Sequence, residues 1–343
     1  MMGVRGSVIP LIRLFSMGTA IGLVKTWRKC PHTLRTMDRY ALLPTVEQLG
    51  ALGEGLGEAV RFHRRIVGGL GGTVDVLVVG ADRSERVVLK RYWLPEPGEI
   101  SPAESEFRAL ALAAQRGIRA PSAIWIDRVG LFPERAIVIS YVEGAVLLDP
   151  ADPNDWAAQL ADTLIEIHRI QPEPGDQDLF PVLGDTAGHQ SEAETLAAFR
   201  RHPLGMELWA RRVEIQATLR PEDPVYVHHD FWPGNTLWIE EKLAAVVDWE
   251  GGSIADPALD VAYCALDMRL LGLNEAAEHF VEAYREHSGR PLENLRYWEL
   301  LALCRPMPDI AMWVPGWQAT GQDISADEAR RRHAALITAS LES

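Results

Sequence analysis

The chain has 343 residues, 47% of them hydrophobic, and a formal net charge of −14 at pH 7. It is long enough to bury a full core and to divide into two lobes. The negative charge argues against nucleic acid as the main partner and favours a small, cationic one. Three scattered cysteines fit neither a disulfide framework nor a zinc pattern, so a reducing, cytoplasmic setting is expected.

The first 36 residues form a basic lead segment, with six basic side chains and no acidic one. Its apolar run, residues 8–24, is interrupted by Pro10 and Arg13, so no signal peptide, membrane span or membrane partner is expected. The acid-free composition is typical of organellar transit segments. It also fits an over-long start assignment with Met37 as the true start, which is the preferred interpretation and predicts little packed structure before that residue.

A glycine-rich turn between two strands follows a short helical lead-in. Residues 44–62 predict one or two short helices. Strand patterns at 65–67 and 74–79 enclose the turn 68–72, and turns of this kind let backbone N–H groups approach a phosphate closely. The glycines of interest there are Gly69, Gly71 and Gly72.

The next strand and helix carry a pair of opposite charges. Arg86–Tyr92 predicts a strand that contains Lys90. A helix from Ser101 to Gly117 follows, and a capping box at its start is expected to engage Glu104. Glu106 lies on the inward face of this helix and is therefore the better partner for Lys90, although Glu104 remains an alternative.

Two further apolar runs, 123–126 and 136–142, complete a five-stranded antiparallel sheet with one main helix. The pattern breaks at Glu143-Gly144 and then changes to a helical period. We therefore expect an α+β fold of two lobes, 37–142 and a mainly helical 143–343. Helices are expected from Pro153 and at about 192–201, 204–219, 259–270, 274–287, 291–304 and 325–341.

The stretch Val225–Asp260 gathers polar residues between short strands. Asp230 and Asn235 lie five positions apart in a loop that a Pro-Gly pair keeps from becoming helix, and Asp248 ends the last strand. The three side chains should therefore converge at one edge of a small hairpin. The strand patterns occur at 225–228, 236–239 and 243–249.

These residue types suit metal-dependent phosphoryl transfer, in which catalysis is mostly positioning and neutralisation of charge. A loop carboxylate accepts the proton of the acceptor hydroxyl, while an Asn and a second carboxylate hold Mg²⁺ on the phosphates. This interpretation makes Asp230 the base and Asn235 and Asp248 the metal ligands. A chance D-x-x-x-x-N is the alternative, and His228 two residues before Asp230 argues against it.

The stretch resembles the aminoglycoside phosphotransferase and choline kinase group of small-molecule kinases in the runs H-H-D-F-W-P-G-N-T-L-W, V-V-D-W-E and D-P-A-L-D. The resemblance covers about Val67 to Cys304. That group usually has glycine where His229 stands, a departure that concerns local packing or the substrate side of the loop. Asp260 is interpreted as a structural anchor, and His228 as a support of the loop.

The resemblance implies a protein-kinase-like fold and transfer of the γ-phosphoryl group of ATP, with Mg²⁺, to a hydroxyl of a small molecule. Lys90 would hold the α- and β-phosphates with Glu106 as its partner, and the glycine-rich turn would cover the nucleotide. Adenine would lie against the connection between the lobes, bonded to backbone groups from Ser140 to Val142. Side chains there do not distinguish ATP from GTP.

The acceptors implied are aminoglycosides, choline-like amino alcohols, homoserine-like metabolites or other sugars. A protein substrate is disfavoured, because no D-F-G to A-P-E segment follows Asp248. The choice of acceptor is expected to depend on the helices in 191–219 and on the loop 305–323. A catalytically inactive, kinase-like binding or scaffold protein is the alternative function. Candidate anchors for a cationic acceptor are Asp267, Asp309 and Asp323.

Overall fold

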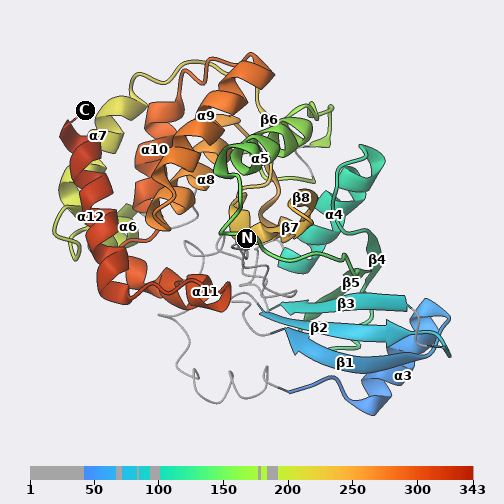
Figure 1. The fold of residues 1–343 in the computed structure, drawn as a ribbon. Coiled ribbons are helices and arrows are strands. Elements are labelled where there is room, and N and C mark those ends of the chain that lie inside the picture. The colour runs from blue at the N-terminus through green and yellow to red at the C-terminus, as the bar shows by residue number, and fades with distance from the viewer. Residues whose placement is uncertain are drawn as a thin grey trace, which may run out of the picture.

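The computed structural model describes residues 42–66, 72–82, 85–92, 101–176, 179–183 and 192–342. The basic lead segment, Gly69 and Gly71 lie outside these ranges, so the expectations for them stay predictions. In the described part, a sheet lobe is followed by a helical lobe, as predicted (Figure 1). No helix there is long and apolar enough to cross a membrane.

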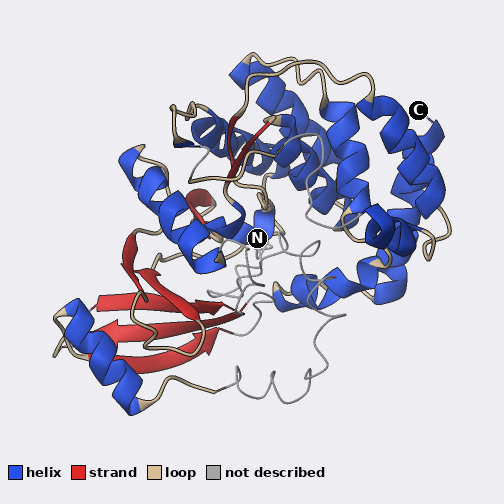
Figure 2. Ribbon diagram, turned by 180° about the vertical axis from the view of Figure 1, so that it is seen from behind, coloured by secondary structure: helices blue, strands red, loops and turns tan. Residues whose placement is uncertain are grey.

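The sheet lobe is a five-stranded antiparallel sheet in the order β1-β2-β3-β5-β4, with α3 and α4 on its two faces (Figure 2). Side chains of the middle strand alternate, so that Val88 and Lys90 face α4 while Leu89 faces α3. The elements are α3 (Val46–Leu56), β1 (Val60–Ile66), β2 (Gly72–Val79), β3 (Glu85–Tyr92), α4 (Pro102–Gln115), β4 (Ala123–Ile126) and β5 (Arg135–Ser140).

The helix α3 begins at a reciprocal cap and is shorter than predicted. Thr45 Oγ1 accepts the backbone N–H of Gln48 at 3.2 Å, and Gln48 Oε1 accepts that of Thr45 at 3.0 Å. The helix ends at Gly57, whose φ of +75° suits glycine. The prediction of helix through Phe62 is wrong, because the last residues of that stretch join the sheet as β1.

The helix α4 starts without the predicted capping box. Ser101 is its N-cap residue, but the side chain makes no capping hydrogen bond. Pro102 occupies the first helical position, where its fixed φ suits the helix and its missing N–H is not needed. Glu104 consequently lies near the surface, 3.8 Å from Arg108, whereas Glu106 is fully buried.

The helical lobe is built around α8, in which every residue except Arg269 is buried. Its two carboxylates, Asp260 and Asp267, are therefore buried with it. Helix α5 packs against α9, and α8 packs against α10 (Figure 1). The helices are α5 (Pro153–His168), α6 (Glu192–Phe199), α7 (Gly205–Gln216), α8 (Ala258–Leu270), α9 (Asn274–Ser288), α10 (Leu295–Cys304), α11 (Val314–Ala319) and α12 (Ala326–Glu342).

The chain from β6 onward forms two small sheets of two strands each, and the loops of interest connect their strands. The predicted hairpin is observed, since β7 (Thr236–Ile239) pairs with β8 (Lys242–Val246) across Glu240-Glu241, two residues with positive φ. The strand β6 (Val225–Val227) pairs instead with β9 (Ser253–Ala255), which was not predicted. A strand of three residues is too short to show a periodic pattern in the sequence.

The connection between the lobes ends in a close contact with the hairpin. Gly144 has a φ of +136°, and a Cβ added there would lie 3.0 Å from Leu237 Cβ. The next residue, Ala145, exchanges two backbone hydrogen bonds with Trp238, at 2.9 and 2.8 Å. Only glycine permits this approach of the two backbones, so the end of the connection is fixed against β7.

The stretch 305–323, predicted as a loop, is partly helical. It contains the 3₁₀ helix η4 (Ile310–Trp313) and α11. A proline in the first turn of α11 is compatible with a helix, although it masks the helical pattern in the sequence. Trp313 and Trp317 are fully buried.

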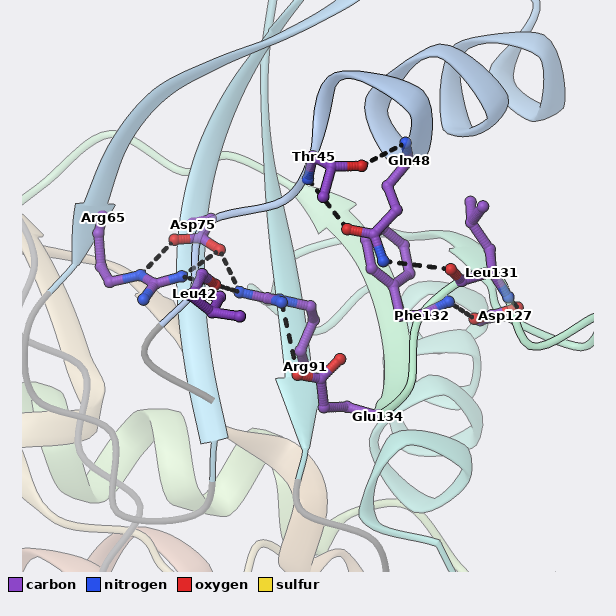
Figure 3. Close-up of polar contacts among 10 residues, drawn as sticks. All are labelled: Leu42, Thr45, Gln48, Arg65, Asp75, Arg91, Asp127, Leu131, Phe132 and Glu134. Carbon is purple, nitrogen blue, oxygen red and sulfur yellow. Dashed lines mark hydrogen bonds and ion pairs between the residues drawn. The ribbon is translucent and has the colours of Figure 1, made fainter. Parts of the chain in front are cut away.

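An ion-pair network lies on the face of the sheet that α3 covers (Figure 3). The buried Asp75 of β2 bonds Arg65 at 2.7 Å and Arg91 at 3.2 Å. Arg91 also lies 3.5 Å from Glu134. Because Arg91 follows Lys90 in β3, the network helps to fix the strand that carries Lys90.

Asp75→Asn should lower the free energy of unfolding by about 3 kcal/mol, because it leaves two arginines around a buried neutral group. Denaturant unfolding measures the change. Asp155→Asn is the matched control, since Asp155 is exposed and its pair with Lys242, at 3.5 Å, lies at the surface. The free energy of unfolding of the control should fall by less than about 1 kcal/mol. Equal losses in both variants would contradict a structural role for the network.

Candidate active site

The loop after β6 is held by Asp260 of α8. The two carboxylate oxygens accept the backbone N–H groups of His228 and His229, each at 2.7 Å. His168 Nε2 lies 3.2 Å from Asp260 Oδ2, and its Nδ1 lies 2.7 Å from the Tyr284 hydroxyl. Burial acts to raise the pKa of Asp260, but His168 and then His228 lower it below its ordinary value. These bonds agree with the anchoring role expected for Asp260.

His228 ties this loop to the strand that ends at Asp248. Its Nε2–H donates to the Val247 carbonyl at 3.1 Å, and its Nδ1 accepts the backbone N–H of Asp230 at 3.3 Å. Burial lowers the pKa of the ring, which agrees with this neutral tautomer. The loop that carries Asp230 and the strand end that carries Asp248 are therefore joined through one side chain.

Asp230 and Asn235 contact each other within the loop. Asn235 belongs to the 3₁₀ turn η2 (Pro233–Asn235), and its Nδ2 donates to Asp230 Oδ2 at 2.9 Å and to the Asp230 carbonyl at 3.0 Å. Asp230 Oδ1 accepts from Arg305 Nη2 at 3.1 Å. The Asp230 carboxylate is thus buried with a donor at each oxygen.

A second cluster joins the two lobes. Lys90 Nζ lies 2.5 Å from Glu106 Oε2 and 2.7 Å from Asp248 Oδ1. The other Glu106 oxygen accepts the backbone N–H of Trp249 at 3.3 Å. The structure therefore places Glu106, rather than Glu104, against Lys90.

The charge of Lys90 compensates part of the negative charge of Glu106 and Asp248. Burial acts to lower the pKa of Lys90, but Asp248 and then Glu106 raise it above its ordinary value. Burial raises the pKa of Glu106, and Lys90 opposes this effect. One buried ammonium between two carboxylates leaves an excess of negative charge, which favours the approach of a cation.

Oxygen ligands that fit Mg²⁺ are present in both clusters. Asn235 Oδ1 is buried and has no hydrogen-bond partner among the described residues. Asp248 follows β8 in a left-handed conformation, with a φ of +69°. Mg²⁺ prefers such hard oxygen donors and completes its shell with phosphate oxygens and water. In the described ranges no group of three His, Cys, Asp or Glu could hold a metal.

His229 also adopts a left-handed conformation, with a φ of +69°. This conformation costs a non-glycine residue roughly 1–2 kcal/mol, which is a physical reason for glycine at this position in the resembling group. The ring centre of His229 lies 5.9 Å from that of Tyr263. Burial, and then the Arg305 guanidinium, lowers the pKa of His229 to about 4, so the ring is neutral near pH 7.

The remaining residues predicted for nucleotide binding lie at the start of β2 and at the end of β5. A Cβ added to Gly72 would lie 2.0 Å from the Arg91 carbonyl, so glycine is required there. The backbone N–H of Ser140 donates to the Ser122 carbonyl at 2.9 Å. That donor is therefore engaged within the sheet lobe, and the adenine contacts expected from Ser140 to Val142 stay a prediction.

The three aspartates predicted as anchors for a cationic acceptor lie in different environments. Asp309 accepts the backbone N–H of Ala311 at 3.0 Å and pairs with Arg330 at 2.8 Å, so an arginine already neutralises it. Asp323 is exposed. Asp267 is fully buried, and neither of its oxygens accepts a hydrogen bond from the described residues. Burial raises the pKa of Asp267 to about 8.

Arg305 was not predicted from the sequence as a residue of the site. Its side chain is 3% exposed, and its guanidinium lies 4.0 Å from the Tyr263 ring centre and 5.2 Å from that of Trp313. A signal was present, because Arg305 is the one charged residue in the run L-L-A-L-C-R-P-M-P. Charged residues are seldom buried without a partner.

Gly234→Ala should destabilise the loop, because its Cβ would lie 2.1 Å from the Trp232 ring. We expect a loss of about 1–3 kcal/mol in the free energy of unfolding, measured with denaturant. Gly50→Ala is the matched control, since nothing lies within 4 Å of a Cβ there and the position is helical. The free energy of unfolding of the control should rise by about 0.5–1 kcal/mol. Identical unfolding of Gly234→Ala and wild type would refute the steric argument.

Comparison with known proteins identifies the family of the chain. Residues 65–299 match the model of a family described as the phosphotransferase enzyme family, APH. A protein of Thermus thermophilus described as a probable ketoamine kinase, TTHA1179, is 28% identical over 243 residues, which cover 66% of this chain and 75% of that protein.

Solved structures share the fold. The streptomycin–ATP–APH(2″)-IIa ternary complex has a TM-score of 0.57 and 18% identity, and covers 76% of this chain and 88% of its own. A choline/ethanolamine kinase family protein from Mesorhizobium loti has a TM-score of 0.55 and 18% identity, over 87% of this chain and 93% of its own. These likenesses confirm the two-lobed, protein-kinase-like fold. Because the family model spans most of the sequence, the chain belongs to the phosphotransferase enzyme family and is a small-molecule kinase.

Proposed function

We propose that this kinase transfers the γ-phosphoryl group of ATP to a hydroxyl of a sugar-derived amine, with Mg²⁺ as the metal. The observation that supports this most is the buried contact of Lys90 with Glu106 and Asp248. Phosphoryl transfer on a kinase-like fold requires a strand lysine, its helix glutamate and a metal-binding aspartate to be in place together. The cluster meets this requirement from elements of both lobes.

On the nucleotide side, Lys90 donates to the α- and β-phosphate oxygens, and Glu106 keeps its ammonium in position. Asn235 and Asp248 would hold Mg²⁺, which neutralises charge that develops on the phosphates. The buried Asn235 Oδ1, which lacks a hydrogen-bond partner among the described residues, supports this role.

On the acceptor side, Asp230 accepts the proton of the acceptor hydroxyl. The acceptor oxygen bonds to the γ-phosphorus while the bond from that phosphorus to the β–γ bridging oxygen breaks, and ADP leaves. Asn235 bonds Asp230 and is also the proposed metal ligand, so one side chain sets the distance between the base and the phosphates.

The class of acceptor is proposed from charge and from the relatives. The chain carries a net charge of −14, which favours a cationic acceptor through long-range attraction. A sugar-derived amine joins such a charge to several hydroxyls. The name of the Thermus relative, ketoamine kinase, and the streptomycin bound in the ternary complex point to the same combination.

A panel of ketoamines, aminoglycosides and amino alcohols, each incubated with ATP and Mg²⁺, tests the proposal by release of ADP. We expect turnover with a sugar-derived amine and a higher melting temperature with Mg·ATP. An absence of both effects would overturn the proposal and favour the alternative of an inactive binding protein.

Asp230→Asn should reduce kcat by about a hundred- to ten-thousandfold, because a carboxamide cannot accept the hydroxyl proton. Binding of Mg·ATP should change little, since the base contacts the acceptor. Steady-state kinetics and nucleotide titration measure the two effects. Near-normal turnover would show that Asp230 is not the base.

Asp248→Asn should weaken binding of Mg·ATP by about tenfold or more, because it removes a charged ligand worth about 1.5–3 kcal/mol. With EDTA in place of Mg²⁺, nucleotide affinities of the variant and the wild type should differ less. Isothermal titration measures all four combinations. A loss of affinity that EDTA leaves unchanged would contradict the role in metal binding.

A further inference from the structure

Arg305 is a buried guanidinium beside the proposed base. It follows α10 directly, and its backbone N–H donates to the Ala302 carbonyl at 3.0 Å. The guanidinium lies between the rings of Tyr263 and Trp313, at 4.0 and 5.2 Å from their centres. Cation–π contacts with two buried rings restrict the rotamers of the side chain. Packing therefore fixes the guanidinium where it meets Asp230.

Both oxygens of the Asp230 carboxylate accept hydrogen bonds. Arg305 Nη2 donates to Oδ1 at 3.1 Å, and Asn235 Nδ2 donates to Oδ2 at 2.9 Å. Donors at the two oxygens fix the plane of the carboxylate as well as its position. A catalytic group has to be held within about 0.5 Å and 10–20° of its productive geometry.

Asp267 lies near the other terminal nitrogen of Arg305. Its Oδ2 is 3.9 Å from Arg305 Nη1, and it is fully buried. It sits seven residues after Asp260, two turns along α8, so the two carboxylates share a face of that helix. Asp260 bonds the backbone of the loop. Asp267 lies near Arg305, which bonds the proposed base. Because burial raises the pKa of Asp267 to about 8, this side chain is mainly neutral at pH 7, and the contacts that hold the guanidinium are the rings of Tyr263 and Trp313.

We propose that Arg305 is a positioning residue for phosphoryl transfer, which fixes the plane of the Asp230 carboxylate. The inference rests on the proposed function, because Arg305 acts through the proposed base. The nucleotide cluster around Lys90 has its own counter-ions in Glu106 and Asp248. Loss of Arg305 should therefore impair the chemical step and leave the binding of ATP unchanged.

Arg305→Met and Arg305→Lys test the proposal with the best acceptor of the panel. The Met variant should lower kcat about a hundredfold, because a misplaced reacting group costs on this order, with KM for ATP unchanged. The Lys variant should recover part of the loss, since it keeps the charge but lacks the planar fork. Arg330→Met is the matched control, because Arg330 pairs with Asp309 at the surface, and its kcat should equal that of wild type.

A double-variant cycle provides a second test, which does not depend on turnover. In melting experiments, the shifts caused by Arg305→Met and Asp230→Asn should be non-additive in the double variant, because the two residues contact each other. This readout requires no acceptor.

Wild-type kcat in Arg305→Met, or additive melting shifts in the double variant, would overturn the inference. Faster turnover in Arg305→Met would do so too, because it would show that the arginine blocks the base. A parallel rise of KM for ATP would assign Arg305 to general structure instead. Failure of the proposed function itself is distinguishable, because wild-type protein would then phosphorylate no acceptor in the panel, whatever the variants do in melting experiments.

Discussion

The ion pairs of Lys90 with Glu106 and Asp248 are the interaction on which the rest of the site depends. Strand β3 supplies the ammonium, α4 supplies one carboxylate, and the end of β8 supplies the other, so the cluster forms only when the two lobes meet. Removal of Lys90 would leave two buried carboxylates without their cation, at a cost of about 3–5 kcal/mol. The orientation of the two lobes therefore depends on these ion pairs, which lie at the proposed nucleotide site.

The loop that carries the proposed base, Asp230, depends in the same way on one buried helix, α8. A helix that is apolar on all sides belongs in the core, and the aspartates of α8 are carried into the core with it. Asp260 has two backbone donors and a histidine, while Asp267 lies against an arginine. Placement of the carboxylates by a rigid helix, rather than by a loop, gives the loop with Asp230 a fixed reference.

Local patterns were sufficient to predict much of the fold and of the site. The spacing of Asp230 and Asn235, the strand face of Lys90 and the inward face of Glu106 are set within a few residues, and the structure brings these side chains together. Arg305 meets Asp230 across 75 residues of sequence, and no local period encodes such a contact. The pairing of β6 with β9 and the helix α11 were missed for related reasons, because short strands and helices that contain proline show little periodicity.

The bond pair between Ala145 and Trp238 has a consequence for motion between the lobes. Because Ala145 is bonded to the hairpin, a rotation between the lobes would be absorbed along this connection by residues 141–143, which lie between the end of β5 and Gly144. A pivot this short acts as a hinge and not as a sliding contact. Displacement then grows with distance from the pivot, and the far edge of the sheet lobe at β1 and α3 would sweep the longest arc when the lobes open.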